Sequence, residues 1–462
     1  MKNKSLAILL SASMVAALVA CGSAETTSSS SASSGSASSA DSSSAAATSE
    51  SSDTSTESGT TDLSGSTIEV AETYTGDQST EFQKLVEQFE QETGVTVNVD
   101  EYGTDYENTM KTRMANNDLP DVFQTHGWSL LRYKEYLMDL SDQDWMSDLD
   151  ESALGVIQDD DGKVYVLMIS ELINGLLVNT EVTDAAGVDI YSIKTWDDFD
   201  AACQKVKDAG YTPIGVNSNP GVLANYAGTW VSYEGEEYQD SDKMLDGSWD
   251  WQDYRDSVLA THADWINKGY FYDDILTMVD EDLTQRLADN KCAFIPGNDP
   301  SVFVTALTLN PDGKYAFLPE PASTDEGVQF VGVGEGDTFG IWKDTENEAA
   351  AKAFLEFMAK PENALAMNNV TGKISCLKST MDIDDSYGLK IYQEMVNQTD
   401  ANGYNVFYEN LWDRKYMPSG MWQIFGNASN EMFDDCSDEN LDSIRDYLLE
   451  NYQDLYEDAQ AQ

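Results

Sequence analysis

Few residues in this 462-residue chain could carry out covalent chemistry, and their spacing matches no catalytic motif. The two histidines, His126 and His262, lie far apart, and neither belongs to an HExxH pattern that would bind a catalytic zinc ion. No GxSxG segment places a serine at a nucleophile elbow, so a Ser-His-Asp hydrolase is unsupported. We therefore predict a protein that is not an enzyme and that uses no cofactor and no metal. A surface glycoside hydrolase stays open as an alternative, because 83 acidic residues make chance carboxylate pairs inevitable.

Two short motifs could bind small ions, but both are incomplete. Residues 332–337 (GVGEGD) do not complete the GxGxxG phosphate-binding fingerprint, and Glu335 and Asp337 would repel a phosphate. We expect a loop there that holds a polar ligand, or an ordinary turn. The acidic run at residues 159–162 (DDDG) fails the EF-hand calcium pattern, so we expect a solvated turn.

The charge of the chain argues against several classes of partner. It carries 26 basic and 83 acidic residues, which gives a formal charge of −57. Such a surface is unsuited to the phosphates of a nucleic acid, and it disfavours docking on anionic lipid through a basic patch. It also resists self-association, so we expect a monomer. The 10 Trp, 23 Tyr and 15 Phe residues are ample for a large hydrophobic core.

The first residues form an export signal rather than part of the fold. Lys2 and Lys4 precede an apolar run at residues 6–20, which is too short to span a bilayer comfortably. The run ends in LVACG, which resembles the lipobox of bacterial lipoproteins and implies cleavage before Cys21 and lipidation of its sulfur. An ordinary secretory peptide with a chance cysteine is the alternative. The Ser-rich stretch that follows, to residue 66, lacks apolar bulk and is predicted to be a flexible tether.

The elements that would position a site follow from residue 67 onward. A strand at 68–70 precedes a helix whose apolar face is spaced i, i+3, i+4, i+7, with Ser79 as its predicted N-cap and Gly94 at its end. Strands at 95–99 and 121–125 complete a βαβαβ unit, which favours a largely parallel sheet with helices on both faces.

Later segments continue this α/β pattern. Thr195 is expected to cap a helix and to form a capping box with Asp198, and beyond Ser386 the chain is predicted to be mostly helical. The four cysteines that remain after lipidation show no CxxC spacing, so buried free thiols are expected and disulfides are the alternative: Cys203, Cys292, Cys376 and Cys436.

Several short segments, taken in chain order, resemble those of one known family. They are GDQSTEF from residue 76, LPDVF from 119, the stretch 161–180, TWDDF from 195, PIGVNSN from 213 and KAFLEFM from 352. Together they are similar to the extracellular solute-binding proteins of ABC importers, in the branch that binds carbohydrates. The resemblance implies an α/β, two-lobe fold of the periplasmic-binding-protein type, with a hinge and a ligand cleft between the lobes.

The resemblance also implies which residues contact the ligand. They are Asp77, His126, Trp128, Glu171, Asn217, Asn219, Trp230, Asn298, Asp299, Glu335, Asp337 and Trp422. Carboxylates and amides hydrogen-bond the hydroxyls of a sugar, and indole rings pack against its C–H face. The chain departs from the family's maltose-binding member at Gly127-Trp128, where that protein has Asp-Arg, and from the family at Asp299, where a Trp is expected. For each residue a core aromatic or a solvated loop side chain is the ordinary alternative.

The predicted function is capture of a mono- or oligosaccharide by closure of the lobes and delivery to the transmembrane permease subunits of an ABC importer. The lipid anchor would be the chain's membrane contact, on the outer face of the bacterial cytoplasmic membrane in a Gram-positive-type envelope. The alternatives are a receptor for a peptide or polyamine, the glycoside hydrolase, and a scaffold or adhesin. The predicted division is 1–20 signal peptide, 21–66 lipidated cysteine and tether, 67–175 with 338–378 N-terminal lobe, and 176–337 with 379–462 C-terminal lobe.

Overall fold

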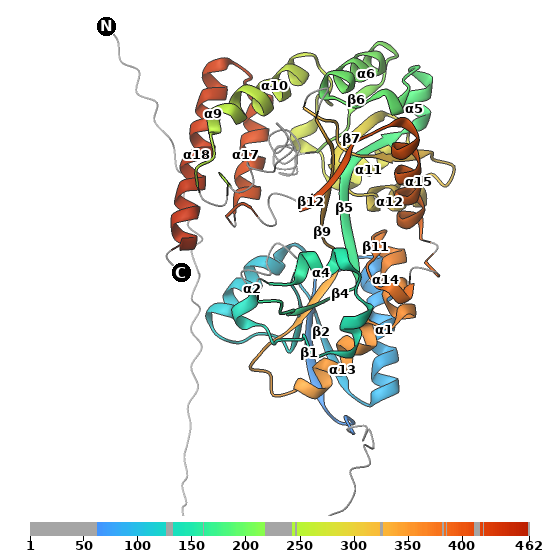
Figure 1. The fold of residues 1–462 in the computed structure, drawn as a ribbon, viewed down its shortest axis with the longest axis vertical. Helices are drawn as coiled ribbons and strands as arrows, with labels where there is room; N and C mark the ends of the chain where they lie inside the picture. Colours follow the sequence, from blue (N-terminus) through green and yellow to red (C-terminus); the bar gives the residue numbers. More distant parts are fainter. Residues whose placement is uncertain are drawn as a thin grey trace, which may run out of the picture. The chain divides into compact units, whose positions relative to one another are not determined.

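Two β-sheets, each covered by helices, define an N-terminal lobe and a C-terminal lobe, drawn in the lower and upper parts of Figure 1. The α/β class and the two-lobe arrangement are those predicted from the sequence. The computed structural model describes residues 62–125, 133–159, 161–217, 243–244, 247–323, 327–380, 383–384, 386–410, 416–418 and 420–460, which belong to one compact unit.

The sheet of the N-terminal lobe has the strand order β2-β1-β3-β10-β4. β1 runs parallel to β2 and β3, as the βαβαβ pattern predicts, whereas β10 is antiparallel to β3 and β4. The strands are β1 (Thr67–Glu72), β2 (Thr96–Glu101), β3 (Val122–Gln124), β4 (Val166–Met168) and β10 (Thr338–Ile341). The surrounding helices are α1 (Asp77–Thr93), α2 (Tyr106–Ala115), α4 (Glu151–Ile157), α13 (Glu348–Met358) and α14 (Pro361–Thr371).

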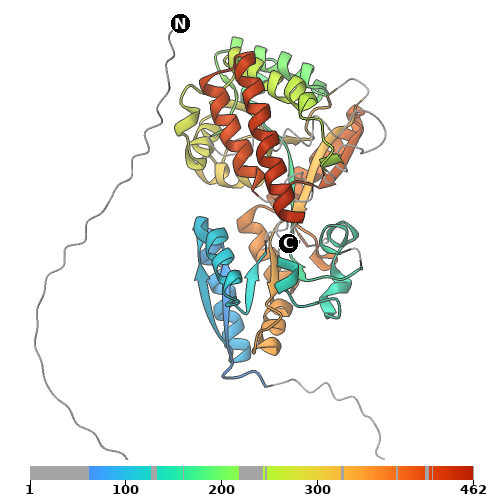
Figure 2. The same ribbon diagram turned by 90° about the vertical axis from the view of Figure 1, so that its left-hand side faces the viewer.

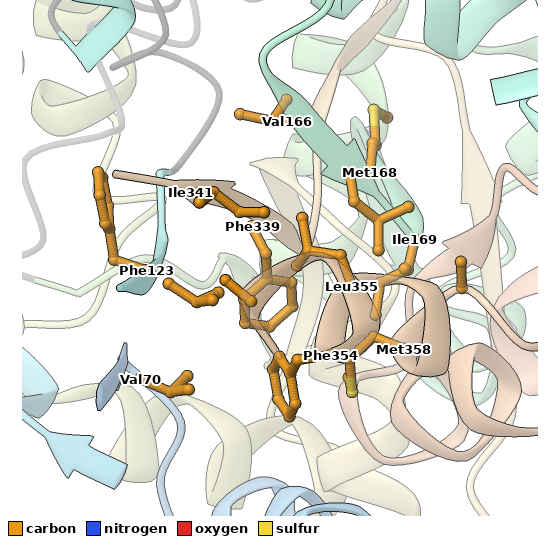
Figure 3. Close-up of a cluster of buried hydrophobic side chains, with 14 of the residues drawn as sticks. Val70, Phe123, Val166, Met168, Ile169, Phe339, Ile341, Phe354, Leu355 and Met358 are labelled. Atoms are coloured by element: carbon orange, nitrogen blue, oxygen red, sulfur yellow. The ribbon is translucent and has the colours of Figure 1, made fainter. Parts of the chain in front are cut away.

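Aromatic rings join α1 and α13 to this sheet. Phe82 of α1 stacks on Phe339 of β10 with the ring centroids 6.0 Å apart, and it meets Phe354 of α13 edge to face at 6.2 Å. Figure 3 shows Phe339 and Phe354 beside the apolar side chains of Leu355 and Met358. The packing of these buried rings fixes the strands from which the N-terminal part of the site projects.

The sheet of the C-terminal lobe has the order β12-β9-β5-β7-β6, and β8 and β11 also pair with β5. β6 is parallel to β7, so their carboxyl ends lie at the same edge of the sheet. The ten-residue β5 runs from the junction of the lobes into the C-terminal lobe (Figure 1). The strands are β5 (Ser170–Asn179), β6 (Thr212–Ile214), β7 (Cys292–Asn298), β8 (Tyr315–Leu318), β9 (Gln329–Glu335), β11 (Ile374–Ser375) and β12 (Val406–Asn410).

Helices cover both faces of this second sheet. A π-helical segment, Arg255–Leu259, joins α9 to α10, and Figure 2 shows the two red helices α17 and α18 packed side by side. The α-helices are α5 (Thr180–Ala185), α6 (Trp196–Asp208), α9 (Trp251–Tyr254), α10 (Ala260–Asn267), α11 (Asp280–Ala288), α12 (Ser301–Leu309), α15 (Tyr387–Asn402), α17 (Met421–Asp434) and α18 (Asp438–Gln460). Short 3₁₀ turns lie at Gly103–Asp105, Lys134–Tyr136, Asp144–Asp148, Ile190–Ser192, Ile275–Thr277 and Lys378–Thr380.

Helix-end predictions are confirmed at two sites and wrong at one. The Thr195 hydroxyl accepts a hydrogen bond from the Asp198 N–H, and the Asp198 carboxylate accepts one from the Thr195 N–H, so the capping box is confirmed. Gly94 ends α1 in the left-handed region, with φ 73°. Ser79 is not the N-cap of α1, because the helix begins at Asp77 and the Ser79 hydroxyl donates to Glu101 instead.

One longer segment also differs from the predictions. The expected loop at 332–337 is mostly strand, because β9 extends to Glu335 and pairs with β5 and β12 on its two sides. The region after Ser386 is mostly helical, as predicted, through α15, α17 and α18, and it also contains the short strand β12, whose first residues, Val406 to Tyr408, are β-branched and aromatic. The four described cysteines are free thiols. Among the helices that the structure describes, none combines the length and apolar character needed to cross a membrane.

Candidate ligand-binding site

A pocket of about 590 Å³ lies at the edge of the C-terminal sheet where β6 and β7 end. Asn217 follows β6, and Asn298 is the last residue of β7. The first turns of α11, α12 and α17 contribute Asp280, Ser301 and Trp422 to the same pocket. In open α/β sheets this edge is the usual place for a ligand, because the loops after parallel strands converge there.

The pocket combines groups that can hydrogen-bond hydroxyls with a flat apolar ring. Its described lining residues include no lysine or arginine, so an anion would find no positive charge there. Acids, amides and hydroxyls accept or donate hydrogen bonds at the rim, and the indole supplies a stacking surface. The polar groups are Asp280, Glu281, Asn217, Gln285, Asn298, Thr284, Ser301 and Thr305, and the indole belongs to Trp422.

Neighbouring groups orient these side chains. The buried Asn217 amide donates to the Asp280 carboxylate, which links the end of β6 to the start of α11. The Asn298 amide donates to the Pro296 carbonyl at 3.3 Å. Trp422 is partly buried and packs against the hydrophobic core of the C-terminal lobe, which restrains the position of its ring.

A second, smaller pocket of about 60 Å³ lies at the corresponding edge of the N-terminal sheet. Thr73 and Tyr74 follow β1, and Gln124 ends β3, so the carboxyl ends of two parallel strands meet here as well. The Gln124 side-chain oxygen accepts hydrogen bonds from both the N–H and the hydroxyl of Thr73, each at 2.7 Å. This pocket therefore has fixed polar walls.

Asp337 lies on the wall of the smaller pocket and is 3% exposed. Its carboxylate accepts hydrogen bonds from Lys373 Nζ at 3.0 Å and from the Ser170 hydroxyl at 2.8 Å. Burial, together with the charge of Asp337, raises the pKa of the Tyr74 hydroxyl well above its usual value, so this group stays protonated. Three chain segments at the boundary between the sheets, 169–170, 335–338 and 372–375, meet at this point, and we call them the lobe junction.

The structure brings together some of the residues predicted to bind a ligand. Asn217, Asn298 and Trp422 share the larger pocket, and Asp337 lines the smaller one. Glu171 and Glu335 are half-buried partners across the β5–β9 pair at the lobe junction.

The remaining predicted residues lie elsewhere. Asp77 is the exposed first residue of α1, and the Asp299 carboxylate accepts the Ser301 N–H at 2.9 Å without lining either pocket. His126, Trp128, Asn219, Trp230 and the predicted lipidation site Cys21 lie outside the described residues.

Sequence reasoning missed the contribution of α11 and of Lys373. Acids in the first turn of a helix such as α11 are explained by the helix dipole alone, so Asp280 and Glu281 gave no sign of a pocket. Lys373 follows α14, and only its contact with Asp337 across the lobe junction places it at the site.

Residues considered for other chemistry have structural roles. His262 is buried among the rings of Trp265, Phe271 and Phe433, and burial lowers its pKa to about 3, so it is neutral. The Asp159 carboxylate accepts the Lys163 N–H at 2.8 Å and pairs with Lys134, which confirms a turn at the acidic run. Across the part of the chain that the structure describes, no group of three or more His, Cys, Asp or Glu could hold a metal ion.

Two α/β lobes that meet at the lobe junction, with a polar pocket at the carboxyl edge of each sheet, define a two-lobe binding protein. The chain belongs to the bacterial extracellular solute-binding protein family, which it matches over residues 74–365. It is 30% identical over 393 residues to the melibiose/raffinose/stachyose-binding protein MelE of Bacillus subtilis (strain 168), which covers 81% of this chain and 87% of that protein.

Solved structures agree with this assignment. A sugar transporter protein of Bacillus licheniformis in complex with stachyose has a TM-score of 0.74 at 27% identity, over 84% of this chain and 100% of that one. A Bacillus subtilis protein in an open conformation has a TM-score of 0.75 at 28% identity, over 86% and 100%. The predicted family and fold are therefore confirmed.

Proposed function

We propose that the protein captures a neutral oligosaccharide outside the cell membrane and delivers it to the permease of an ABC importer. The observation that carries the proposal is the larger pocket, where amides, acids and the Trp422 indole converge and the described lining residues include no basic side chain. A pyranose presents hydroxyls at its edge and C–H groups on its face, which match these two kinds of surface. The names of MelE and of the stachyose complex support galactose-containing oligosaccharides as the first candidates.

Capture would proceed by closure of the lobes. The larger pocket would hold the ligand first, and rotation about the lobe junction would bring the smaller pocket of the N-terminal lobe against it. Closure removes water, so each hydrogen bond gains strength in a less polar environment. The chain would act as a receptor and would carry out no covalent step.

The sequence features at the N-terminus complete the proposal. Residues 1–20 would be removed, Cys21 would carry the lipid anchor, and residues up to 66 would tether the lobes to the membrane. The N-terminal lobe would comprise 67–175 and 338–378, and the C-terminal lobe 176–337 and 379–462. The chain would act as a monomer, with the permease subunits as its protein partners.

A receptor for a cation such as a polyamine is the second candidate, because Asp280 and Glu281 both line the larger pocket.

A direct test of both candidates is thermal unfolding of the full chain with stachyose, raffinose, spermidine or a short peptide. A ligand at 100 times its dissociation constant raises the free energy of unfolding by about 2.7 kcal/mol. We expect a shift with an oligosaccharide and recovery of the sugar unchanged. A shift with spermidine and none with sugars would replace the proposed ligand.

Removal of the Trp422 ring tests the pocket itself. Trp422→Ala should weaken oligosaccharide binding at least about tenfold, because a stacked ring is lost from the pocket wall, and Trp422→Phe should retain part of the affinity. Tyr408→Ala is the matched control, since this aromatic side chain is 39% exposed and lies outside both pockets. Isothermal titration calorimetry gives each dissociation constant, and equal affinity for Trp422→Ala and the unaltered chain would remove this pocket from the proposal.

A further inference from the structure

The wall of the larger pocket turns sharply at Gly297. This residue lies between Pro296 and Asn298, which both line the pocket. Its φ is 66°, in the left-handed region that glycine adopts without a steric penalty. A flexible residue at this point would leave the direction of the Asn298 side chain poorly defined unless other groups hold the backbone.

Two buried side chains hold the backbone of Gly297 from both sides. Its N–H donates to Glu320 Oε1 at 2.5 Å, and its carbonyl accepts a hydrogen bond from the Asn174 side-chain amide at 3.4 Å. Glu320 is 2% exposed and Asn174 is 9% exposed, and neither lines a pocket. Each polar group of this one residue therefore has a buried partner that does not itself face the ligand.

The two partners are fixed by strands that lead to the lobe junction. Glu320 exchanges backbone hydrogen bonds with Phe330 of β9, at 2.7 and 3.0 Å. Asn174 belongs to β5 and lies opposite Gly332 of β9. β5 begins at Ser170, whose hydroxyl bonds to Asp337. The hydrogen bonds of Glu320 and Asn174 to Gly297 therefore join the wall of the pocket to β5 and β9, the two strands that lead to the lobe junction.

Holding Gly297 does not require a charged group at position 320. An uncharged amide could also accept the Gly297 N–H, and burial of a carboxylate is unfavourable. Burial raises the pKa of Glu320 to about 8, so the group is largely protonated at neutral pH. In that state the Glu320 side chain still accepts a hydrogen bond from the Gly297 N–H.

We propose that Glu320 and Asn174 are positioning residues that clamp Gly297 and thereby aim Asn298 into the ligand pocket. Ligand affinity would then depend on two side chains that do not touch the ligand. This inference rests on the proposed function, because it assigns residues that set the geometry of the same site.

The test compares stachyose and raffinose affinity with stability in a set of full-chain variants. Glu320→Leu and Asn174→Leu each remove one side of the clamp and should weaken binding about tenfold, as expected for loss of one buried hydrogen bond. Glu320→Gln keeps an acceptor for the Gly297 N–H and should bind within about twofold of the unaltered chain.

Gln329→Leu is the matched control for a merely structural role. Gln329 is also a buried polar residue that bonds two backbone groups, the Lys194 carbonyl at 3.0 Å and the Asn405 N–H at 2.7 Å, but it lines neither pocket. This variant should lower the melting temperature and leave both dissociation constants unchanged.

The outcomes separate the inference from the proposed function. Glu320→Leu that binds like the unaltered chain, or Glu320→Gln that binds as weakly as Glu320→Leu, would overturn the clamp. If Glu320→Leu fails to fold, Asn174→Leu decides the question by the same titration. An unaltered chain that binds neither sugar would overturn the proposed function, and the clamp would lose its basis for that separate reason.

Discussion

Single buried residues set how the stability of this protein depends on pH. Burial raises the pKa of Glu72 from 4.5 to about 7 and that of Glu320 from 4.5 to about 8. A carboxyl whose pKa is raised by folding keeps a proton that the unfolded chain has lost. Stability therefore falls as the pH rises from the unfolded pKa of 4.5 to the folded pKa of each group. His262 acts in the opposite direction, because burial lowers its pKa from 6.5 to about 3. Stability therefore rises with pH between about 3 and 6.5 through this residue.

Glu320→Gln should flatten the pH dependence above neutrality. Between pH 6.5 and 8 the His262 side chain is neutral in the folded state and loses at most half a proton in the unfolded state, so the buried carboxyls dominate the change. Glu320 alone should lower the free energy of unfolding by on the order of 2 kcal/mol across this window, and the amide should remove that loss. Urea unfolding at pH 6.5, 7 and 8 measures the effect.

Glu72→Gln is the comparison for this experiment. Because the pKa of Glu72 is raised only to about 7, its replacement should alter mainly the lower part of the window. An unchanged slope between pH 6.5 and 8 in Glu320→Gln would contradict the assignment of this pH dependence to Glu320.

At the scale of secondary-structure elements, the connection between β9 and β10 leaves no room for a side chain at Gly336. A Cβ atom added at Gly336 would lie 2.6 Å from the Ser170 carbonyl oxygen and would also contact the Ser170 hydroxyl oxygen. Gly336 also donates its N–H to that carbonyl at 3.0 Å, so the two crossing segments cannot separate without breaking this bond. The glycine is thus required by close approach rather than by a left-handed backbone.

Gly336→Ala should therefore destabilise the chain by about 1–3 kcal/mol, as for other side chains forced into a packed site. Gly155→Ala in α4 is the matched control, because nothing lies within 4 Å of its added Cβ and alanine favours a helix by up to about 1 kcal/mol over glycine. Chemical unfolding of both variants measures the difference. Equal stability for Gly336→Ala and the unaltered chain would show that the crossing segments have room to move.

Local sequence patterns predicted elements best where one interaction decides the outcome. The apolar face of α1 and the capping box at Thr195 depend on spacing alone, and both were predicted correctly. The prediction of Ser79 as the N-cap of α1 was wrong because its hydroxyl donates to Glu101 of β2, a partner that local sequence does not show. The prediction of a loop at 332–335 was wrong because pairing with β5 and β12 overrides the preference of glycine for turns.

At the scale of the whole molecule, the predicted anchor decides where the protein is found. Cys21→Ser removes the sulfur that would carry the lipid, so the chain should appear in the culture medium instead of the membrane fraction. Fractionation followed by immunoblotting measures this, and stachyose affinity of the released chain serves as the control for folding. Retention of Cys21→Ser in the membrane fraction would contradict lipid anchoring at this residue.

The site was predictable only as far as the family resemblance reached. Asn217, Asn298 and Trp422 were predicted from the family resemblance and line one pocket, although no local pattern marks them as a group. Asp280 and Lys373 come from segments whose proximity to the site arises from tertiary folding. Several helices and strands could be predicted from sequence, but the edge at which they converge depends on strand order.

The hydrogen bonds of the lobe junction limit how the lobes can move. Ser170 bonds to Asp337, and Ile374 and Ser375 pair with Glu171 and Ser170, so the three segments lie beside one another. A lobe attached by one flexible linker can rotate in any direction, whereas a lobe attached through adjacent, hydrogen-bonded segments rotates mainly about a single axis. Closure on a solute then restrains one large motion instead of many, and the entropy lost on capture is correspondingly small.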